Sequence, residues 1–203
     1  MSRTCYIIGA GDFINDVIKK DIDDIVICAD AGYLHALNNN IKADLIIGDF
    51  DSLKQIPDDI SIIRAPVIKD ETDVALCINE GIKRGYKKFR LYGCLGKRIE
   101  HSLANIILLL AYDKYDTRII ENNMEMFIMQ PKDIYKDTNK TGYISLFSIT
   151  NKSLLTIKGL KYELDSKEIN NQFPLGIDNE ALGKDFSIEL IKGKLLVITR
   201  FDN

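Results

Sequence analysis

The 203-residue sequence lacks several features that assign many chains to a class at once. It has no Cys-x-x-Cys pair, and Cys5, Cys28, Cys77 and Cys94 are expected to be reduced thiols. The longest apolar run, residues 106–111, is far too short to cross a bilayer. The first residues contain no signal-type apolar segment. We therefore expect a cytoplasmic protein with no membrane partner.

The chain also lacks an excess of positive charge. Its formal net charge is −3, which gives no general attraction to polyanions, so nucleic acid is not an expected partner. Apolar residues make up 46% and charged residues 28%, as in ordinary globular proteins, and a long disordered segment is excluded. A small anionic substrate stays possible if positive charge is gathered locally or a cation accompanies it.

Residues 1–122 alternate short apolar runs with helix-like segments. Val74, Ala75, Ile78 and Ile82 share one helical face, and a second helical pattern covers residues 102–112. The expected strands are residues 5–8, 25–28, 45–47, 60–63, 89–92 and 117–120. This alternation predicts an α/β domain with a mostly parallel sheet and flanking helices.

Residues 123–203 have a different character, with short β-prone runs, intervening turn residues and no helical pattern. Lys192-Gly193 between two alternating runs predicts a hairpin tip. The expected strands are residues 124–129, 143–149, 154–157, 160–164, 186–190 and 195–199. We predict an all-β second domain, a small sandwich or barrel.

Polar residues follow five successive strands or strand-like runs of the first domain. In an open parallel sheet, ligands bind beyond the carboxyl ends of the strands, so these segments are expected to meet at one rim. Each segment alone fits ordinary turn chemistry. The five segments are residues 9–12, 30–32, 48–52, 69–73 and 93–98.

Asp49 and Asp51 alternate around Phe50, so both carboxylates can face one point while the ring anchors the loop to the core. Two close carboxylates repel unless a cation lies between them, and hard oxygen ligands together with phosphate suit Mg²⁺. From this motif alone, a solvated acidic turn is an equally good interpretation.

Asp73 begins the helix that contains Val74, with Thr72 or Asp70 available as its N-cap. Free backbone N–H groups at a helix start suit phosphate, so Asp73 could add a metal oxygen while Thr72 and Lys69 contact phosphate. Taken alone, a plain helix cap explains Thr72 and Asp70 fully and is the favoured interpretation.

Arg98 lies in a glycine-flanked loop, and His101 and Asn105 are one helical turn apart. Arginine binds phosphate oxygens in a bidentate manner and stabilises charge that develops in phosphoryl transfer. His101 is a proton carrier or a structural residue, and Asn105 a ligand contact or a buried group that fixes the loop. His35 has no metal-ligand spacing and is expected to be structural.

Together these motifs resemble the thiamine pyrophosphokinase family. The resemblance covers nearly the whole chain and rests on four motifs in the family's order, at residues 29–32, 43–52, 69–73 and 93–106. It implies an α/β catalytic domain followed by a β-sandwich, and a homodimer with active sites at the dimer interface. It also implies that ATP donates its terminal diphosphate to the hydroxyl of thiamine, which gives thiamine diphosphate and AMP.

Carried over to this sequence, the resemblance assigns roles to individual residues. Asp49, Asp51 and Asp73 become the Mg²⁺ ligands, and Asp30 lines the site. Thr72 and Arg98 contact phosphate, and the ATP site also includes Lys69, His101 and Asn105. The thiamine contacts fall on Asp178 and Asn179 in the second domain, where Asp178 replaces the family's serine. The chain has no tryptophan, so any ring stacking must use another side chain.

Three alternatives remain open at the level of sequence. One is a pyrophosphokinase for another heterocyclic alcohol, such as a hydroxymethylpterin, with the same metal site. A second is a metal-dependent phosphohydrolase, but that activity would not explain the motifs at residues 69–73 and 93–105. The third is a non-catalytic module that senses thiamine or a nucleotide, against which the carboxylates and Arg98 argue.

Overall fold

The computed structural model describes residues 3–13, 18–50, 60–66 and 71–202. The chain forms two compact units, Met1–Asn122 and Asn123–Asn203. Within the described part of the chain, no helix has the length and apolar character needed to span a bilayer.

The first unit is built on six strands in the order β6-β5-β1-β2-β3-β4, and the five pairings between them are parallel. The central strands are short and fully apolar on both faces, as expected for a sheet covered on two sides. The strands are β1 (Thr4–Ile8), β2 (Ile25–Ala29), β3 (Leu45–Gly48), β4 (Ser61–Arg64), β5 (Lys88–Tyr92) and β6 (Asp116–Glu121).

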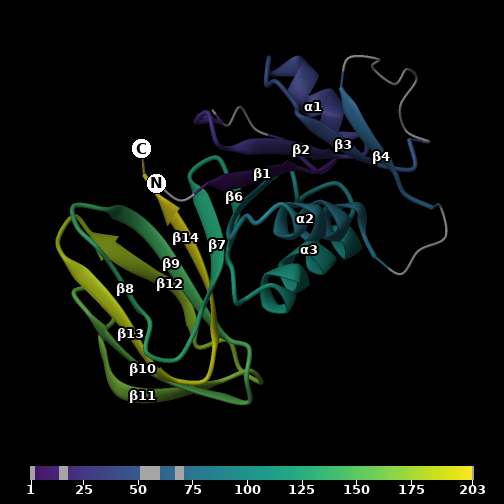
Figure 1. Ribbon diagram of the computed structural model, residues 1–203. Coiled ribbons are helices and arrows are strands. Elements are labelled where there is room, and N and C mark those ends of the chain that lie inside the picture. The colour runs from purple at the N-terminus through teal and green to yellow at the C-terminus, as the bar shows by residue number, and fades with distance from the viewer. Residues whose placement is uncertain (1–2, 14–17, 51–59, 67–70, 203) are drawn as a thin grey trace. The chain divides into compact units, whose positions relative to one another are not determined.

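Helices cover both faces of this sheet (Figure 1). The helix α1 (Gly32–Asn38) lies on one face, and α2 (Asp73–Lys83) and α3 (Ile99–Ala111) lie on the other. Gly81 lets α2 approach the sheet closely, because a Cβ at this position would lie 2.6 Å from the Phe89 ring. This arrangement confirms the predicted α/β unit.

All four cysteines are buried in the first unit. Burial raises the pKa of the Cys5, Cys28 and Cys94 thiols to about 12. Burial also raises the pKa of Cys77 well above its usual value. These thiols are therefore protonated packing groups at neutral pH, in agreement with the expectation of reduced cysteines.

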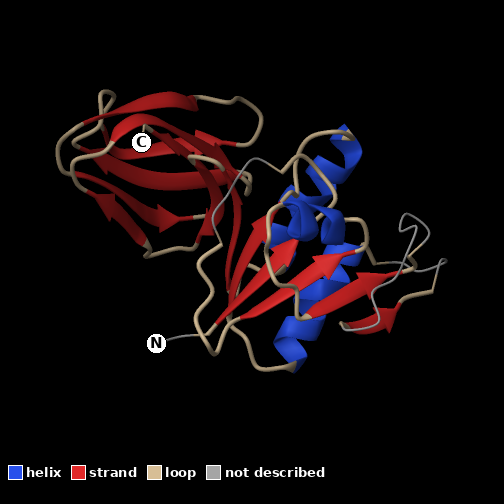
Figure 2. Ribbon diagram, turned by 90° about the horizontal axis from the view of Figure 1, so that it is seen from above, coloured by secondary structure: helices blue, strands red, loops and turns tan. Residues whose placement is uncertain are grey.

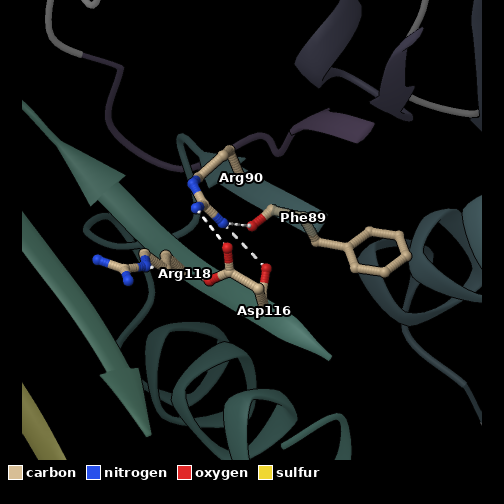
Figure 3. A network of polar contacts seen from close by, with 4 residues as sticks. All are labelled: Phe89, Arg90, Asp116 and Arg118. Carbon is tan, nitrogen blue, oxygen red and sulfur yellow. Dashed lines mark hydrogen bonds and ion pairs between the residues drawn. The ribbon is translucent and has the colours of Figure 1, made fainter. Parts of the chain in front are cut away.

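A charged network joins β5 to β6 (Figure 3). The Arg90 guanidinium donates to Asp116 Oδ2 at 2.8 Å and to the Phe89 carbonyl at 2.8 Å, and Arg118 Nε lies 3.2 Å from Asp116 Oδ1. Partial burial acts to raise the pKa of Asp116, but these two arginines lower it overall. Asp116 is the first residue of β6, so the network lies at the amino ends of the strands, opposite the predicted rim.

The second unit consists of two antiparallel sheets, which Figures 1 and 2 show packed face to face. Their orders are β12-β9-β14-β7 and β11-β10-β13-β8. Alternate residues of the strands point into a shared core that includes Leu146, Leu155, Ile188 and Val197. The strands are β7 (Met124–Met129), β8 (Ile134–Asp137), β9 (Thr141–Ser148), β10 (Lys152–Lys158), β11 (Leu164–Asn170), β12 (Gly176–Leu182), β13 (Phe186–Lys192) and β14 (Leu195–Phe201). The sandwich prediction is confirmed.

Two local predictions for this unit are wrong. The strand predicted at residues 160–164 is not formed: Leu160 makes an isolated bridge to Ala181, residues 161–163 lie outside strands, and β11 begins only at Leu164. The turn at Lys192-Gly193 is present, but β13 pairs with β10 and β8 whereas β14 pairs with β7 and β9. The chain therefore changes sheets at Gly193 instead of closing a hairpin.

Candidate functional site

A cavity of about 440 Å³ opens at the carboxyl end of the parallel sheet. Its walls come from the segments after β1, β2 and β5 and from the first turns of α2 and α3, which is where an open α/β sheet binds ligands. The described residues lining it include Ala10, Gly11, Asp30, Thr72, Asp73, Gly96, Lys97, Arg98, His101 and Asn105. Six of the predicted site residues are therefore brought together.

Asp30 follows β2 and has a left-handed backbone, with φ of 44°. Its amide donates to the Ile47 carbonyl at 2.8 Å, and Gly48 packs directly against its Cβ, which fixes its position. Its Oδ1 atom is buried and has no hydrogen-bond partner among the described residues. A buried carboxylate oxygen without a partner is costly, so this atom is suited to a ligand or a cation.

Thr72 is the N-cap of α2, as predicted. Its Oγ1 accepts from the Ala75 amide at 3.2 Å, and Asp73 is the first helical residue. A helix of 11 residues starts here, so the positive end of its dipole is at the cavity wall. The threonine hydroxyl keeps its proton free to donate, because the cap uses it as an acceptor.

The segment after β5 forms a second wall. Arg98, the N-cap of α3, makes an exposed ion pair with Glu100 at 2.6 Å, and its backbone is extended. Hydrogen bonds from the Glu100 amide and from Arg98 lower the pKa of Glu100. Asn105 is buried and donates to the Cys94 carbonyl at 2.7 Å, so it fixes the start of the loop, residues 93–98, that leads to Arg98. Because its ion pair with Glu100 is exposed, the guanidinium of Arg98 stays accessible at the cavity edge.

Asp49 comes directly after β3 and is partly buried. The next residue, Phe50, is 6% exposed, packs in the core beneath α1 and lies 5.2 Å from the Arg64 guanidinium. The aromatic anchor in the Asp-Phe-Asp motif is thus confirmed. Asp51, Lys69 and Asp70 lie outside the described residues.

Among the residues that the structure describes, no three carboxylate, histidine or cysteine groups lie close enough to form a metal site by themselves. Asp30 and Asp73 line the same cavity, and Asp49 follows the glycine that packs on Asp30. Any cation held here therefore needs further oxygens, from Asp51 or from a bound phosphate.

The wall that contains Ala10 and Gly11 belongs to the segment 9–12 that the sequence placed at the rim, but no ligand contact was predicted within it. Its amides are joined to the opposite loop, with Gly9 N to Tyr92 O at 2.8 Å and Gly11 N to Gly93 O at 2.7 Å. Lys97 crosses the cavity edge and donates to the Ala10 carbonyl at 2.6 Å. The close approach of these two segments requires a glycine at position 9, since a Cβ there would lie 2.6 Å from the Gly93 carbonyl oxygen.

Asp178 and Asn179 belong to the second unit and lie on β12. Asp178 is exposed, has φ of 54° and lies at a bulge in the pairing with β9. Asn179 is buried, and its carboxamide accepts from the Tyr162 amide at 2.9 Å and donates to the Tyr162 carbonyl at 2.7 Å. The exposed Asp178 is accessible to a ligand, whereas the Asn179 side chain is occupied in holding Tyr162.

A parallel α/β unit with an anion-suited cavity, followed by a β-sandwich, defines a two-unit enzyme of phosphate chemistry. Residues 18–121 match the family model described as thiamin pyrophosphokinase, catalytic domain, and residues 132–195 match thiamin pyrophosphokinase, vitamin B1 binding domain. The chain belongs to the thiamin pyrophosphokinase family, and it is an enzyme of thiamine pyrophosphorylation.

Individual relatives agree with this assignment. The thiamine pyrophosphokinase of Bacillus subtilis is 30% identical over 184 residues, which cover 85% of this chain and 86% of the relative. The crystal structure of a thiamine pyrophosphokinase from Bacillus subtilis has a TM-score of 0.84 at 25% identity, over 98% of this chain and 100% of that one. A structure from Geobacillus thermodenitrificans has the same TM-score at 23% identity, over 98% of each chain, and supports the fold.

Proposed function

We propose that this chain transfers the terminal diphosphate of ATP to the hydroxyl group of thiamine, giving thiamine diphosphate and AMP. In this reaction the thiamine hydroxyl oxygen bonds to the β-phosphorus, and the bond from that phosphorus to the oxygen bridging it to the α-phosphorus breaks. Such a transfer depends on alignment and charge neutralisation more than on covalent catalysis. The first unit would hold ATP, and the second would contribute to thiamine binding.

The cavity of the first unit supports the ATP part of the proposal. Thr72 and the start of α2 offer a hydroxyl and backbone N–H groups to phosphate oxygens. Arg98 offers a fork of N–H donors that can leave its exposed partner Glu100 when a phosphate competes. Lys69, His101 and Asn105 complete the proposed ATP site, with Asn105 acting through its hold on the Cys94 carbonyl.

Magnesium fits the donor set of this rim. The proposed ligands are Asp49, Asp51 and Asp73, with Asp30 as a further carboxylate, and all are hard oxygen donors. The buried Oδ1 atom of Asp30, which has no partner within the described ranges, is the observation that favours a cation here. When bound, Mg²⁺ would neutralise phosphate charge during the transfer.

Asp178 supports a thiamine contact in the second unit. It is an exposed carboxylate that can accept from an aminopyrimidine and attract a cationic ring. Asn179 would act by fixing the neighbouring Tyr162 segment, because both ends of its carboxamide are hydrogen-bonded there. We further propose a homodimer, as the family resemblance implies, and a cytoplasmic location.

The single observation that carries the proposal is one cavity containing Asp30, Asp73 and Arg98 in a chain that matches both family models. The test is to incubate the protein with ATP, Mg²⁺ and thiamine and to identify the products. AMP together with thiamine diphosphate is the expected result. ADP or free phosphate without thiamine dependence would indicate a kinase or hydrolase, AMP formed with a pterin alcohol alone would indicate the related pyrophosphokinase, and no turnover would indicate a sensor.

A further inference from the structure

His35 connects two walls of the cavity without lining it. It lies on α1, which begins two residues after Asp30. Its Nε2 atom is 2.9 Å from the carbonyl oxygen of Gly11, in the segment after β1. The histidine thus joins the wall formed by residues 29–31 to the wall formed by Ala10 and Gly11.

The donor and the acceptor of this hydrogen bond can be assigned. A carbonyl oxygen can only accept, so Nε2 of His35 carries the proton and donates it. The imidazole also stacks on Phe13, with 5.3 Å between ring centroids and 14° between planes. One side chain therefore holds the segment after β1 at two points, residues 11 and 13.

The opposite side of the same segment is held by the backbone. Gly11 N donates to Gly93 O at 2.7 Å, and Asp12 N donates to Leu95 O at 2.7 Å. These bonds fix the segment against the loop that carries Arg98, whereas the bond from His35 fixes it against α1. Without His35, the Gly11 carbonyl loses its link to the wall that contains Asp30.

We propose that His35 is a positioning residue for nucleotide binding: by donating to the Gly11 carbonyl it sets the distance between the Ala10–Gly11 wall and the Asp30 wall of the cavity. This inference rests on the proposed function for the identity of the ligand. The hydrogen bond itself can be tested without turnover.

A pair of variants that differ by one methylene group isolates the donor. His35→Gln places an amide N–H near the position of Nε2, whereas His35→Asn is too short to reach the Gly11 carbonyl. Both are polar and suit a half-buried site, so both are expected to fold, which thermal unfolding checks. His35→Phe keeps an aromatic ring beside Phe13 without the donor, and Asn38→Ala, an exposed change on the same helix, is the control.

The first measurement is hydrogen exchange of the Gly11 and Asp12 amides in the full chain. We expect exchange about five-fold faster in His35→Asn and His35→Phe, and near wild type in His35→Gln and Asn38→Ala, since one hydrogen bond contributes about 1 kcal/mol. Equal exchange rates in His35→Gln and His35→Asn would show that the hydrogen bond from His35 does not hold this segment. That conclusion would not depend on the protein's substrate.

The second measurement is the affinity for α,β-methylene ATP with Mg²⁺, an analogue whose α–β linkage cannot be cleaved in the proposed transfer. Affinity about five-fold weaker in His35→Asn, restored in His35→Gln, is the expected result. In turnover, the KM for ATP should rise while kcat and the KM for thiamine stay within about two-fold. If the exchange rates change but the affinity for the analogue does not, His35 has a structural role only and the proposal is wrong. If the wild-type protein does not bind the analogue, the proposed function fails, while the hydrogen bond from His35 to Gly11 is still supported by the exchange data.

Discussion

Two side chains with buried polar atoms, one in each unit, have opposite hydrogen-bonding states. Asn179 on β12 has both ends of its carboxamide hydrogen-bonded to the backbone of Tyr162. Asp30 after β2 has a buried Oδ1 atom with no partner in the part of the chain that the structure describes. A satisfied buried group stabilises the fold, whereas an unsatisfied carboxylate oxygen in a cavity costs stability and is free to bind. The hydrogen bonds of these two side chains therefore favour a structural role for Asn179 and suit Asp30 to a ligand.

The largest effect is expected at the proposed Mg²⁺ site. Asp49→Asn should reduce the rate of thiamine diphosphate formation by about 100-fold or more, because it removes a charged ligand from the proposed Mg²⁺ site. Its thermal unfolding should match wild type. Asp23→Asn, an exposed change in the same unit, is the control and should keep full activity. Near-wild-type turnover in Asp49→Asn would contradict the metal assignment.

Asp30→Asn tests the unsatisfied group itself. We expect activity to fall about 10-fold or more, while the free energy of unfolding stays constant or rises by up to about 1 kcal/mol, because a neutral amide costs less to bury than a carboxylate. Asparagine also tolerates the left-handed backbone at this position. Chemical denaturation and steady-state kinetics measure the two effects. A variant that is both destabilised and fully active would reverse the assignment.

Asn179→Ala tests the satisfied group. It leaves the Tyr162 amide and carbonyl without partners, so we expect a loss of about 2 kcal/mol in the free energy of unfolding. The exposed Asn171→Ala serves as the matched control in the same unit. Denaturant titration measures both variants. Unchanged stability in Asn179→Ala would show that its two hydrogen bonds contribute nothing net, and the contrast with Asp30 would fail.

An effect that appears only at high pH is expected from the thiols of the first unit. Because folding raises the pKa of Cys28 to about 12, the native state keeps a proton that the unfolded chain releases at lower pH. Stability from this group is fully present below its usual pKa and is lost as pH rises toward 12. The loss amounts to about 1.4 kcal/mol per pH unit for one thiol. Denaturation from pH 8 to 10.5 should show a shallower decline in Cys28→Ala than in wild type; identical slopes would contradict this.

The sequence predicted the elements whose burial pattern is strong. The strands β1, β2 and β3 are apolar runs, and the N-cap Thr72 marks the start of α2. The prediction missed β8, β11 and β12, which lie at sheet edges, because partly exposed strands carry many polar residues and show little alternation. The hairpin at Gly193 was wrong since a local pattern does not reveal which sheet a strand joins.

The site was predictable where a motif follows a strand. Asp30, Asp73 and Arg98 meet in one cavity because the carboxyl ends of parallel strands share one edge. The start of α3 was placed three residues late, since its N-cap Arg98 makes no side-chain cap bond. The contact between His35 and Gly11 could not be foreseen, because the two residues are 24 positions apart and belong to different elements.

The position of β14 has a consequence for the order of folding. It is the last strand of the sandwich, yet it pairs along both edges, between β7 and β9, which precede it in the chain. These two strands cannot complete their sheet until the segment after Gly193 is in place. We therefore expect the sandwich to close by a late, non-local step that is slow compared with pairing of neighbouring strands. During synthesis, this unit would wait for its final strand to leave the ribosome.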